Sequence, residues 1–293
     1  MINYYERAKA QPEIFKQFTY KELLFVNYDC PLVLTKLDNW SQHNYFLYVV
    51  TGKKGFHTPD RSWLLTEGKA AFIKRGACII EKFFDEILCL IAFFVPDDYL
   101  RTFLRDNMSL LSKKDLPAVT NELVIELEVT EVMTAYYQSV IPYFSSDVKP
   151  PEELLELKFR ELLINIITNP ANNALNAYLQ TLMQINSDNL QHIVEANCYY
   201  NLPLTAYAKL CNRSLSSFKR DFSKAYKSSP SYWLQDKRLL YAQKLLLTTD
   251  KPVSDISFES GFENSTHFSK VFKKRFGAAP LQYRKQKLAA HFS

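Results

Sequence analysis

Residues 255–284 read DISFESGFENSTHFSKVFKKRFGAAPLQYR and predict two helices joined by a tight turn. Gly261 interrupts the first apolar stripe, and glycine is the residue that adopts positive φ without steric cost. Asn264 or Ser265 then supplies a side-chain oxygen that can cap a second helix, which ends at Gly277. A short helix, a turn and a basic second helix are typical of a helix-turn-helix reader of DNA.

The second helix has two different faces. Phe268, Phe272 and Phe276 recur every four residues and predict a face that is buried in a small core. Another face carries hydrogen-bond donors and cations, namely Thr266, Ser269, Lys270 and Lys273. An ordinary surface hairpin with solvated lysines is the alternative interpretation of this stretch alone.

The hairpin occurs twice, which favours the DNA-binding interpretation. Residues 204–230 read LTAYAKLCNRSLSSFKRDFSKAYKSSP, and their aromatic residues precede those of the other copy by fifty positions. Upstream of the turn the offset is forty-nine, so the second copy has one extra residue in its turn. Residues 231–247 predict a stiff connecting helix of about 25 Å at ~1.5 Å per residue. This length is of the order of the ~34 Å between successive major grooves.

The last hundred residues resemble the DNA-binding domain of the AraC/XylS transcription regulators. The residues that carry the resemblance are Ala208, Ser214, Phe218, Phe222, Arg238, Ala242, Leu245, Leu246, Asp255, Ile256, Gly261, Phe262, Phe268, Ser269, Phe272, Lys273, Lys274, Gly277, Pro280, Tyr283 and Arg284. Ser257 and Asn212 depart from the alanine and glycine that are usual in the family, and asparagine also accepts the left-handed conformation. In layout the chain is similar to the ExsA type, the activators of type III secretion genes. That likeness implies control by a protein partner instead of a small ligand.

The exposed helix faces and the resemblance together assign the DNA contacts. Bases in one groove are assigned to Ser216, Lys219 and Arg220, and bases in the next groove to Thr266, Ser269 and Lys270. His267 is assigned to a base or a phosphate. Phosphates are assigned to Lys224, Lys227, Lys273, Lys274 and Arg275. Lysine and arginine donate to guanine O6 and N7, which is the commonest specific contact in the major groove.

The charge of the 293 residues is distributed unevenly. Residues 190–293 hold 17 Lys+Arg and 7 Asp+Glu, a net charge of +10, whereas residues 1–189 carry a net charge of −5. We therefore expect only the C-terminal part to bind a polyanion. Five cysteines without a CxxC pair predict a reduced, cytoplasmic protein. The sequence shows no signal peptide or membrane span, so no membrane partner is expected.

Short β-branched and aromatic runs between residues 21 and 95 predict a barrel or a sandwich. The family resemblance implies a cupin-like barrel. The predicted fold class is therefore α+β, with an N-terminal cupin-like β-barrel with flanking helices and a C-terminal all-α domain with two helix-turn-helix motifs. Only His43 and His57 fall in the barrel region and they form no HxH pair, so we predict no metal, no cofactor and no catalytic residue.

After the predicted strands, the sequence pattern indicates helices. Helices are expected over 97–104, 121–140 and 173–184, although 123–129 alternates and is also compatible with a strand. Residues 152–168 predict an amphipathic helix whose stripe either covers the barrel or forms a dimer contact. The stripe residues assigned to dimerisation are Leu155, Phe159, Leu162, Leu163 and Ile166. The expected domains are 1–168 for sensing and dimerisation, 169–187 as a helical linker and 188–293 for DNA binding.

These patterns predict a sequence-specific DNA-binding transcriptional regulator that activates transcription. The expected partners are double-stranded DNA, RNA polymerase, a second copy of the chain, and a regulatory protein or small-molecule effector at the N-terminal domain. The alternatives are a metal-independent cupin-type ligand-binding protein or enzyme with an accessory DNA-binding domain, and an architectural DNA binder. A barrel filled by its own side chains favours control by a protein, and a hollow polar barrel favours a small ligand.

Overall fold

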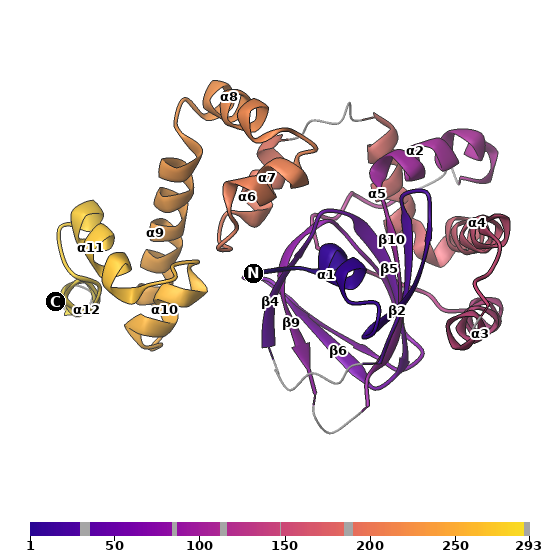
Figure 1. Ribbon diagram of the computed structural model, residues 1–293. Coiled ribbons are helices and arrows are strands. Elements are labelled where there is room, and N and C mark those ends of the chain that lie inside the picture. Colours follow the sequence, from indigo (N-terminus) through magenta and orange to yellow (C-terminus); the bar gives the residue numbers. More distant parts are fainter. Residues whose placement is uncertain (30–35, 84–86, 112–115, 147, 185–189, 290–293) are drawn as a thin grey trace. The chain divides into compact units, whose positions relative to one another are not determined.

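The computed structural model describes residues 1–29, 36–83, 87–111, 116–146, 148–184 and 190–289 (Figure 1). The internal contacts divide the chain into two compact units, Met1–Asp188 and Asn189–Ser293. The predicted short link over 185–188 and the predicted cap at Asp188 or Asn189 lie outside the described residues.

Two sheets form the centre of the first unit. Its strands are β1 Ile2–Asn3, β2 Phe15–Tyr20, β3 Leu23–Asp29, β4 Lys36–Ser41, β5 Asn44–Thr51, β6 Lys53–His57, β7 Ser62–Thr66, β8 Ala70–Ile73, β9 Gly76–Lys82, β10 Cys89–Val95 and β11 Val124–Leu127. Among the described residues, one sheet has five strands in the order β1-β4-β9-β6-β7. The other has six strands in the order β11-β8-β5-β10-β3-β2. Because the strands form two sheets rather than one closed barrel, the unit is a cupin-like sandwich.

The sequence of strand β10 in the six-stranded sheet is a continuous apolar run, and the burial of its side chains explains this pattern. Successive side chains of a strand point to opposite faces. Leu90, Ala92 and Phe94 lie in the core between the two sheets. Their neighbours Ile91 and Phe93 lie in a second core on the opposite face, which helices cover. Both faces of this strand are therefore buried, and no polar alternation is left in the sequence.

The helices of the first unit gather mainly on one side of the six-stranded sheet (Figure 1). They are α1 Tyr4–Ala10, α2 Asp97–Asp106, α3 Glu131–Ser145, α4 Glu152–Thr168 and α5 Asn173–Gln184, with 3-10 turns at Met108–Leu110 and Pro170–Asn172. The helices expected over 152–168 and 173–184 are confirmed. The helix expected over 121–140 is wrong in its first part, where β11 forms, and the strand alternative is confirmed.

The apolar stripe of α4 packs against its own sheet. All five side chains assigned to dimerisation, Leu155, Phe159, Leu162, Leu163 and Ile166, are buried in the core beneath the helices. The Phe159 ring makes edge contacts with Phe25, Phe46 and Phe93 of the sheet, at centroid distances of 6.0, 6.1 and 6.3 Å. A second chain could contact these side chains only if α4 left the sheet, so the stripe holds the fold together and is not an available dimer surface.

Helix α5 belongs to the same core. Leu175 and Leu179 are buried together with the α4 stripe. In addition, the Asn176 amide donates to the carbonyl of Ile167 at the end of α4, at 2.9 Å. The part of 169–187 that is described therefore packs into the first unit, whereas the sequence predicts a linker there.

The second unit is helical throughout its described residues. Its helices are α6 Leu190–Asn197, α7 Leu204–Leu210, α8 Leu215–Tyr226, α9 Pro230–Thr248, α10 Val253–Glu259, α11 Ser265–Phe276 and α12 Pro280–Ala289. Helices α6 to α8 lie at one end of α9, and α10 to α12 surround its other half (Figure 1). In the described parts of both units, no helix has the length and apolar character that crossing a membrane requires.

Truncation of the central aromatic ring tests the role of the α4 stripe. We expect Phe159→Ala to lower the free energy of unfolding of the first unit by about 3–5 kcal/mol, because it leaves a cavity among aromatic rings. Urea unfolding of the full chain measures this loss. The matched control is Leu157→Ala on the same helix, where the side chain is 62% exposed and the change should stay within about 0.5 kcal/mol. Equal effects of the two substitutions would contradict this account of the stripe.

Candidate nucleic-acid interface

The two hairpins make the same turn with different residues. The first helix of each hairpin ends at a left-handed residue, Asn212 with φ 53° or Gly261 with φ 78°. The next N–H then donates to a carbonyl five residues back, from Arg213 to Ala208 at 2.9 Å and from Phe262 to Ser257 at 3.0 Å. This pairing satisfies carbonyls that the end of the helix leaves open.

Each second helix starts at a polar cap. The Ser214 hydroxyl accepts from the Ser217 N–H at 3.2 Å. In the second copy, Asn264 Oδ1 accepts from the N–H groups of Thr266 and His267 at 2.8 and 3.0 Å, so the expected cap at Asn264 is confirmed. The extra residue of the second turn is Glu263, whose carboxylate accepts from Asn201 Nδ2 at 2.6 Å. The insertion therefore binds the segment between α6 and α7.

Aromatic side chains hold both second helices in place. Phe218 and Phe222 of α8 are fully buried, as are Phe268 and Phe272 of α11. Trp233 of α9 packs on the α8 rings, with centroids 5.7 Å from Phe222 and 4.5 Å from Tyr226. Tyr283 of α12 packs likewise on Phe272 and Phe276, at 5.6 and 5.7 Å. The repeat is therefore a repeat of packing as well as of sequence.

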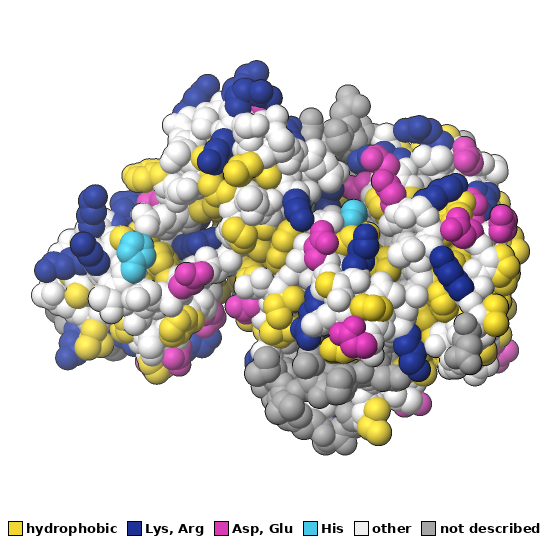
Figure 2. Space-filling view, in the orientation of Figure 1, with side chains coloured by type: hydrophobic (Ala, Val, Ile, Leu, Met, Phe, Trp, Pro, Cys, Tyr) yellow, Lys and Arg dark blue, Asp and Glu magenta, His cyan; other side chains and the backbone are white. Residues whose placement is uncertain are grey.

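The polar faces of α8 and α11 point to solvent. The exposed residues among those assigned to DNA are Ser216, Lys219, Arg220, Lys224, Lys227, Thr266, His267, Lys270, Lys273, Lys274 and Arg275, and Ser269 is half-buried. Figure 2 shows Lys and Arg side chains gathered over the part of the surface that these two helices form. Donors and cations are thus available to base edges and phosphates.

Two arginines of these helices are already engaged by carboxylates. Arg220 Nε donates to Asp221 Oδ1 at 3.1 Å, although its side chain is 74% exposed and can still reach outward. Arg213 also donates to Asp221. Arg275, which the sequence assigns to phosphates, donates through Nε to Asp236 of α9 at 2.7 Å. It therefore fastens α11 to α9.

Arg238 joins the segment before the first hairpin to the turn of the second hairpin through three backbone carbonyls. Its Nε donates to the carbonyl of Cys198 at 3.0 Å, and another guanidinium nitrogen donates to the carbonyl of Tyr200. A third bond runs to the carbonyl of Gly261 in the second turn, at 3.3 Å. The first two carbonyls lie before the first hairpin and the third lies inside the second. Because guanidinium presents five N–H donors in a planar fork, one side chain can serve all three.

The close approach at Gly261 explains why this position has no side chain. A Cβ atom there would lie 2.6 Å from the carbonyl oxygen of Tyr199 and 3.2 Å from Arg238 Nε. The Tyr199 ring also packs on Tyr241 of α9, with centroids 4.5 Å apart. The segment between α6 and α7 thus lies directly against the second turn.

Arg238 is a residue whose role the sequence reasoning missed. It lies on the inward face of α9, because Leu234, Tyr241 and Leu245 are buried at helical spacing on either side of it. An arginine within an apolar stripe indicates a buried side chain that hydrogen-bonds to other parts of the fold, because burying an unpaired charge costs free energy. Ile256 and Phe258 begin the first apolar stripe in the sequence. In the structure Ile256 is buried in the core, whereas Phe258 is 59% exposed.

Comparison with known proteins agrees with this geometry. A family model of the ExsA N-terminal regulatory domain matches residues 44–178, and a model of a helix-turn-helix domain matches residues 207–286. The chain belongs to the AraC/XylS family of transcriptional regulators. Its members include VirF of Yersinia enterocolitica, a virulence regulon transcriptional activator. VirF is 27% identical over 245 residues, which cover 83% of this chain and 90% of VirF.

Two further matches cover a similar share of the chain. The regulator ExsA of Pseudomonas aeruginosa is 26% identical over 229 residues, which cover 78% of this AraC/XylS chain and 81% of ExsA. The structure of ToxT from Vibrio cholerae matches 90% of this chain and 98% of its own, with 14% identity and a TM-score of 0.42. The family assignment makes this protein a DNA-binding transcription regulator, as its sequence predicts.

Two glycine substitutions distinguish the cost of the close contact at Gly261 from the cost of a positive φ angle alone. Gly261 and Gly277 have similar positive φ angles, 78° and 83°, but a Cβ at Gly277 meets no atom within 4 Å. We expect Gly277→Ala to destabilise the second unit by about 1 kcal/mol. Gly261→Ala should cost about 3 kcal/mol or more, since it also displaces the Tyr199 carbonyl. Thermal unfolding of both variants measures the difference, and similar losses would refute the proposed contact.

Proposed function

We propose that this regulator activates transcription by reading two successive major grooves with α8 and α11. The observation that carries the proposal is the pair of matching hairpins in one unit, both connected to α9. Each hairpin buries its aromatic residues and leaves its polar face to solvent. The Arg238 bonds to both halves of the unit support simultaneous use of the two faces.

The residue assignments follow the place of each polar residue along its helix. We assign bases to Ser216, Lys219 and Arg220 on α8 and to Thr266, Ser269 and Lys270 on α11, with His267 beside them. We assign phosphates to Lys224, Lys273 and Lys274, which are exposed further along the two helices. Phosphate contacts position a protein on DNA, and base contacts select the sequence.

Activation and a contact with RNA polymerase are the outputs that we propose. The support is that VirF, which aligns with most of this chain, is named a transcriptional activator. We assign the protein to the cytoplasm, where DNA and polymerase are found, and we assign it no catalytic role. If the chain forms a homodimer, the dimer uses a surface other than the buried stripe of α4.

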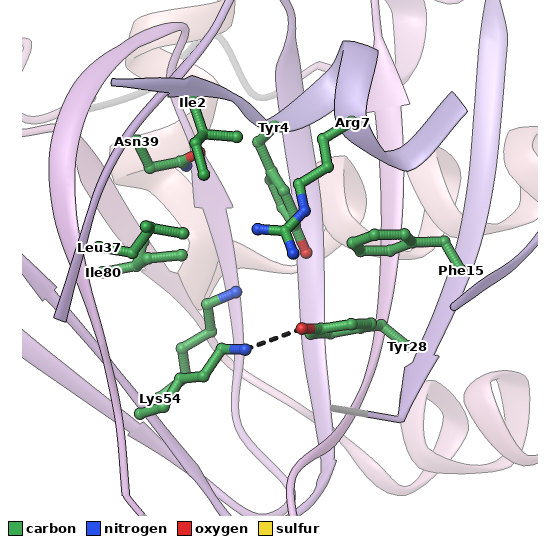
Figure 3. Close-up of a pocket in the computed structure, with 10 residues that line it drawn as sticks. Ile2, Tyr4, Arg7, Phe15, Tyr28, Leu37, Asn39, Lys54 and Ile80 are labelled. Atoms are coloured by element: carbon green, nitrogen blue, oxygen red, sulfur yellow. Dashed lines mark hydrogen bonds between the residues drawn. The ribbon is translucent and has the colours of Figure 1, made fainter. Parts of the chain in front are cut away.

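We propose that a protein controls the first unit. Its support is the filled interior of the sandwich, where aromatic rings such as Tyr45, Phe56 and Phe94 are fully buried. A cavity inside this interior has a volume of about 10 Å³. Pockets for organic effectors have volumes of roughly 300–1,000 Å³, so an organic ligand in this cavity (Figure 3) would have to displace core side chains.

Selection of DNA sites from a random pool, followed by footprinting and transcription in vitro, tests the proposed activity. We expect discrete protected sites and a rise in transcript when RNA polymerase holoenzyme and a selected site are both present. Uniform coverage without a preferred sequence would instead support an architectural DNA binder. Protection of discrete sites with a fall in transcript would contradict activation.

Two lysine substitutions distinguish base contacts from phosphate contacts. We expect Lys219→Ala to cost about 1–3 kcal/mol on the selected site and to relax the preference at one base pair. Lys274→Ala should weaken selected and random DNA alike and reduce the salt slope of binding by about 1. Fluorescence anisotropy on both DNAs measures these effects. An equal loss on selected and random DNA for Lys219→Ala would count against its contact with a base.

A further inference from the structure

Strand β7, Ser62–Thr66, is the outermost strand of the five-stranded sheet. It pairs with β6 on one side, and within the described parts of the chain no strand pairs with its other side. An edge strand of this kind offers a row of backbone N–H and C=O groups to a further strand. The edge of β7 is therefore a place where another extended segment can join the sheet.

The hairpin between β6 and β7 decides which backbone groups of β7 face outward. The Thr58 N–H donates to the carbonyl of Arg61 at 2.8 Å, so these two residues form a hydrogen-bonded pair. Hydrogen-bonded and non-hydrogen-bonded pairs alternate along an antiparallel ladder. Leu64 lies opposite Gly55, three pairs further along this ladder. The N–H and C=O groups of Leu64 therefore point away from β6, toward the free edge.

The side chains of β7 do not protect this edge. Edge strands are commonly protected by lysine, proline, bulges or a covering helix, whereas β7 reads SWLLT and contains no charge. Trp63 and Leu65 are buried in the core between the two sheets. Leu64 points to the opposite, outer face of the sheet, and its side chain is 53% exposed. An apolar side chain is thus exposed at the centre of the strand.

The other sheet edges are short, charged or covered. Strand β1 has two residues. Strand β2 carries the exposed Lys16, and its Gln17 Nε2 donates to the carbonyl of Ala8 in α1 at 2.8 Å. Strand β11 carries the exposed Glu126. Strand β7 differs from all three, because it combines an edge without charge with an exposed apolar side chain.

We propose that β7 pairs antiparallel with β7 of a second copy of the chain, centred on Leu64. Because the backbone groups of Leu64 face outward, Leu64 of each copy would donate to and accept from Leu64 of the other. The two leucine side chains would then bury each other on the outer face of the sheet. Such a pairing has two-fold symmetry, so every contact away from the centre occurs twice.

The charges beside the strand favour a second copy as the occupant. Arg61 lies three residues before Leu64, and Glu67 lies three residues after it. In the symmetric register each Arg61 lies opposite Glu67 of the other copy, and opposite charges at such positions stabilise a sheet. Both residues are exposed. Arg61 forms an ion pair with Glu122 of its own chain, yet its side chain remains 54% exposed, and guanidinium has further N–H donors.

The contact involves residues of the first unit alone and leaves the α4 stripe in its core. A pairing of two five-residue strands is a small interface, so we expect a weak and reversible dimer. The proposal does not depend on how the second unit reads DNA, and it is tested without DNA.

Sedimentation equilibrium of the full chain over a range of protein concentrations tests the dimer. We expect the unsubstituted chain to show a monomer–dimer equilibrium. Leu64→Lys places two like charges opposite each other and removes the apolar contact, so it should raise the dissociation constant about tenfold or more. The matched control is Val132→Lys on α3, where the original side chain is 61% exposed, and it should leave the dissociation constant unchanged.

Exchange of the two charges tests the register. Arg61→Glu and Glu67→Arg should each weaken the dimer, because each places like charges opposite each other. The double substitution should restore the dimer, since opposite charges face each other again, and any effect on the ion pair with Glu122 is common to monomer and dimer. Failure of the double substitution to restore the dimer would overturn the proposal.

Two further results would also contradict the edge-strand dimer. One is a chain that stays monomeric up to about 0.5 mM. The other is a loss of dimer in Val132→Lys that equals the loss in Leu64→Lys, which would place the contact on the helices or attribute it to charge alone.

Discussion

The guanidinium of Arg238 is the connection on which the DNA-binding unit depends. It donates to carbonyls before the first hairpin and to a carbonyl in the turn of the second. Buried carbonyls require donors, and loss of this one side chain would remove a donor from each of the three. Gly261 completes the connection, since only a residue without a side chain lets the Tyr199 carbonyl approach the turn. Helix α9 therefore does more than separate two motifs, because its middle is hydrogen-bonded to the segment before the first hairpin and to the turn of the second.

The two hairpins share a frame but present different chemistry to DNA. Asn212 and Gly261 take the same left-handed conformation, and aromatic residues fill equivalent positions behind both second helices. The exposed faces differ, because Lys219 and Arg220 of α8 correspond in sequence to Ser269 and Lys270 of α11. Two helices that read different base sequences can pack in the same way, but they must present different polar side chains to the grooves.

The sequence predicts the helical elements better than the sheet. Helix 152–168 and the repeated hairpins follow from periodicity and turn residues, which are local signals. The sequence of strand β6 gives no clear strand signal, because Lys54, a buried charge, interrupts its apolar pattern. The distinction between a closed barrel and two sheets depends on strand pairing, which periodicity does not encode. For the DNA-binding faces, the sequence places the residues on exposed helix faces. It does not reveal that Asp236 engages Arg275, or that Arg238 connects the segment before the first hairpin to the turn of the second.

The central claim is that α8 and α11 act on one duplex as a connected pair. The most direct measurement is the affinity of the protein for a selected DNA site before and after five base pairs are inserted between the part of the site that α8 contacts and the part that α11 contacts. The insertion turns the second groove to the opposite face of the duplex, since one turn is about 10 bp. The account predicts a loss of affinity of about 100-fold or more, because one helix loses its base contacts and each unfavourable base pair costs about 1–3 kcal/mol. Equal affinity for both DNAs would contradict it.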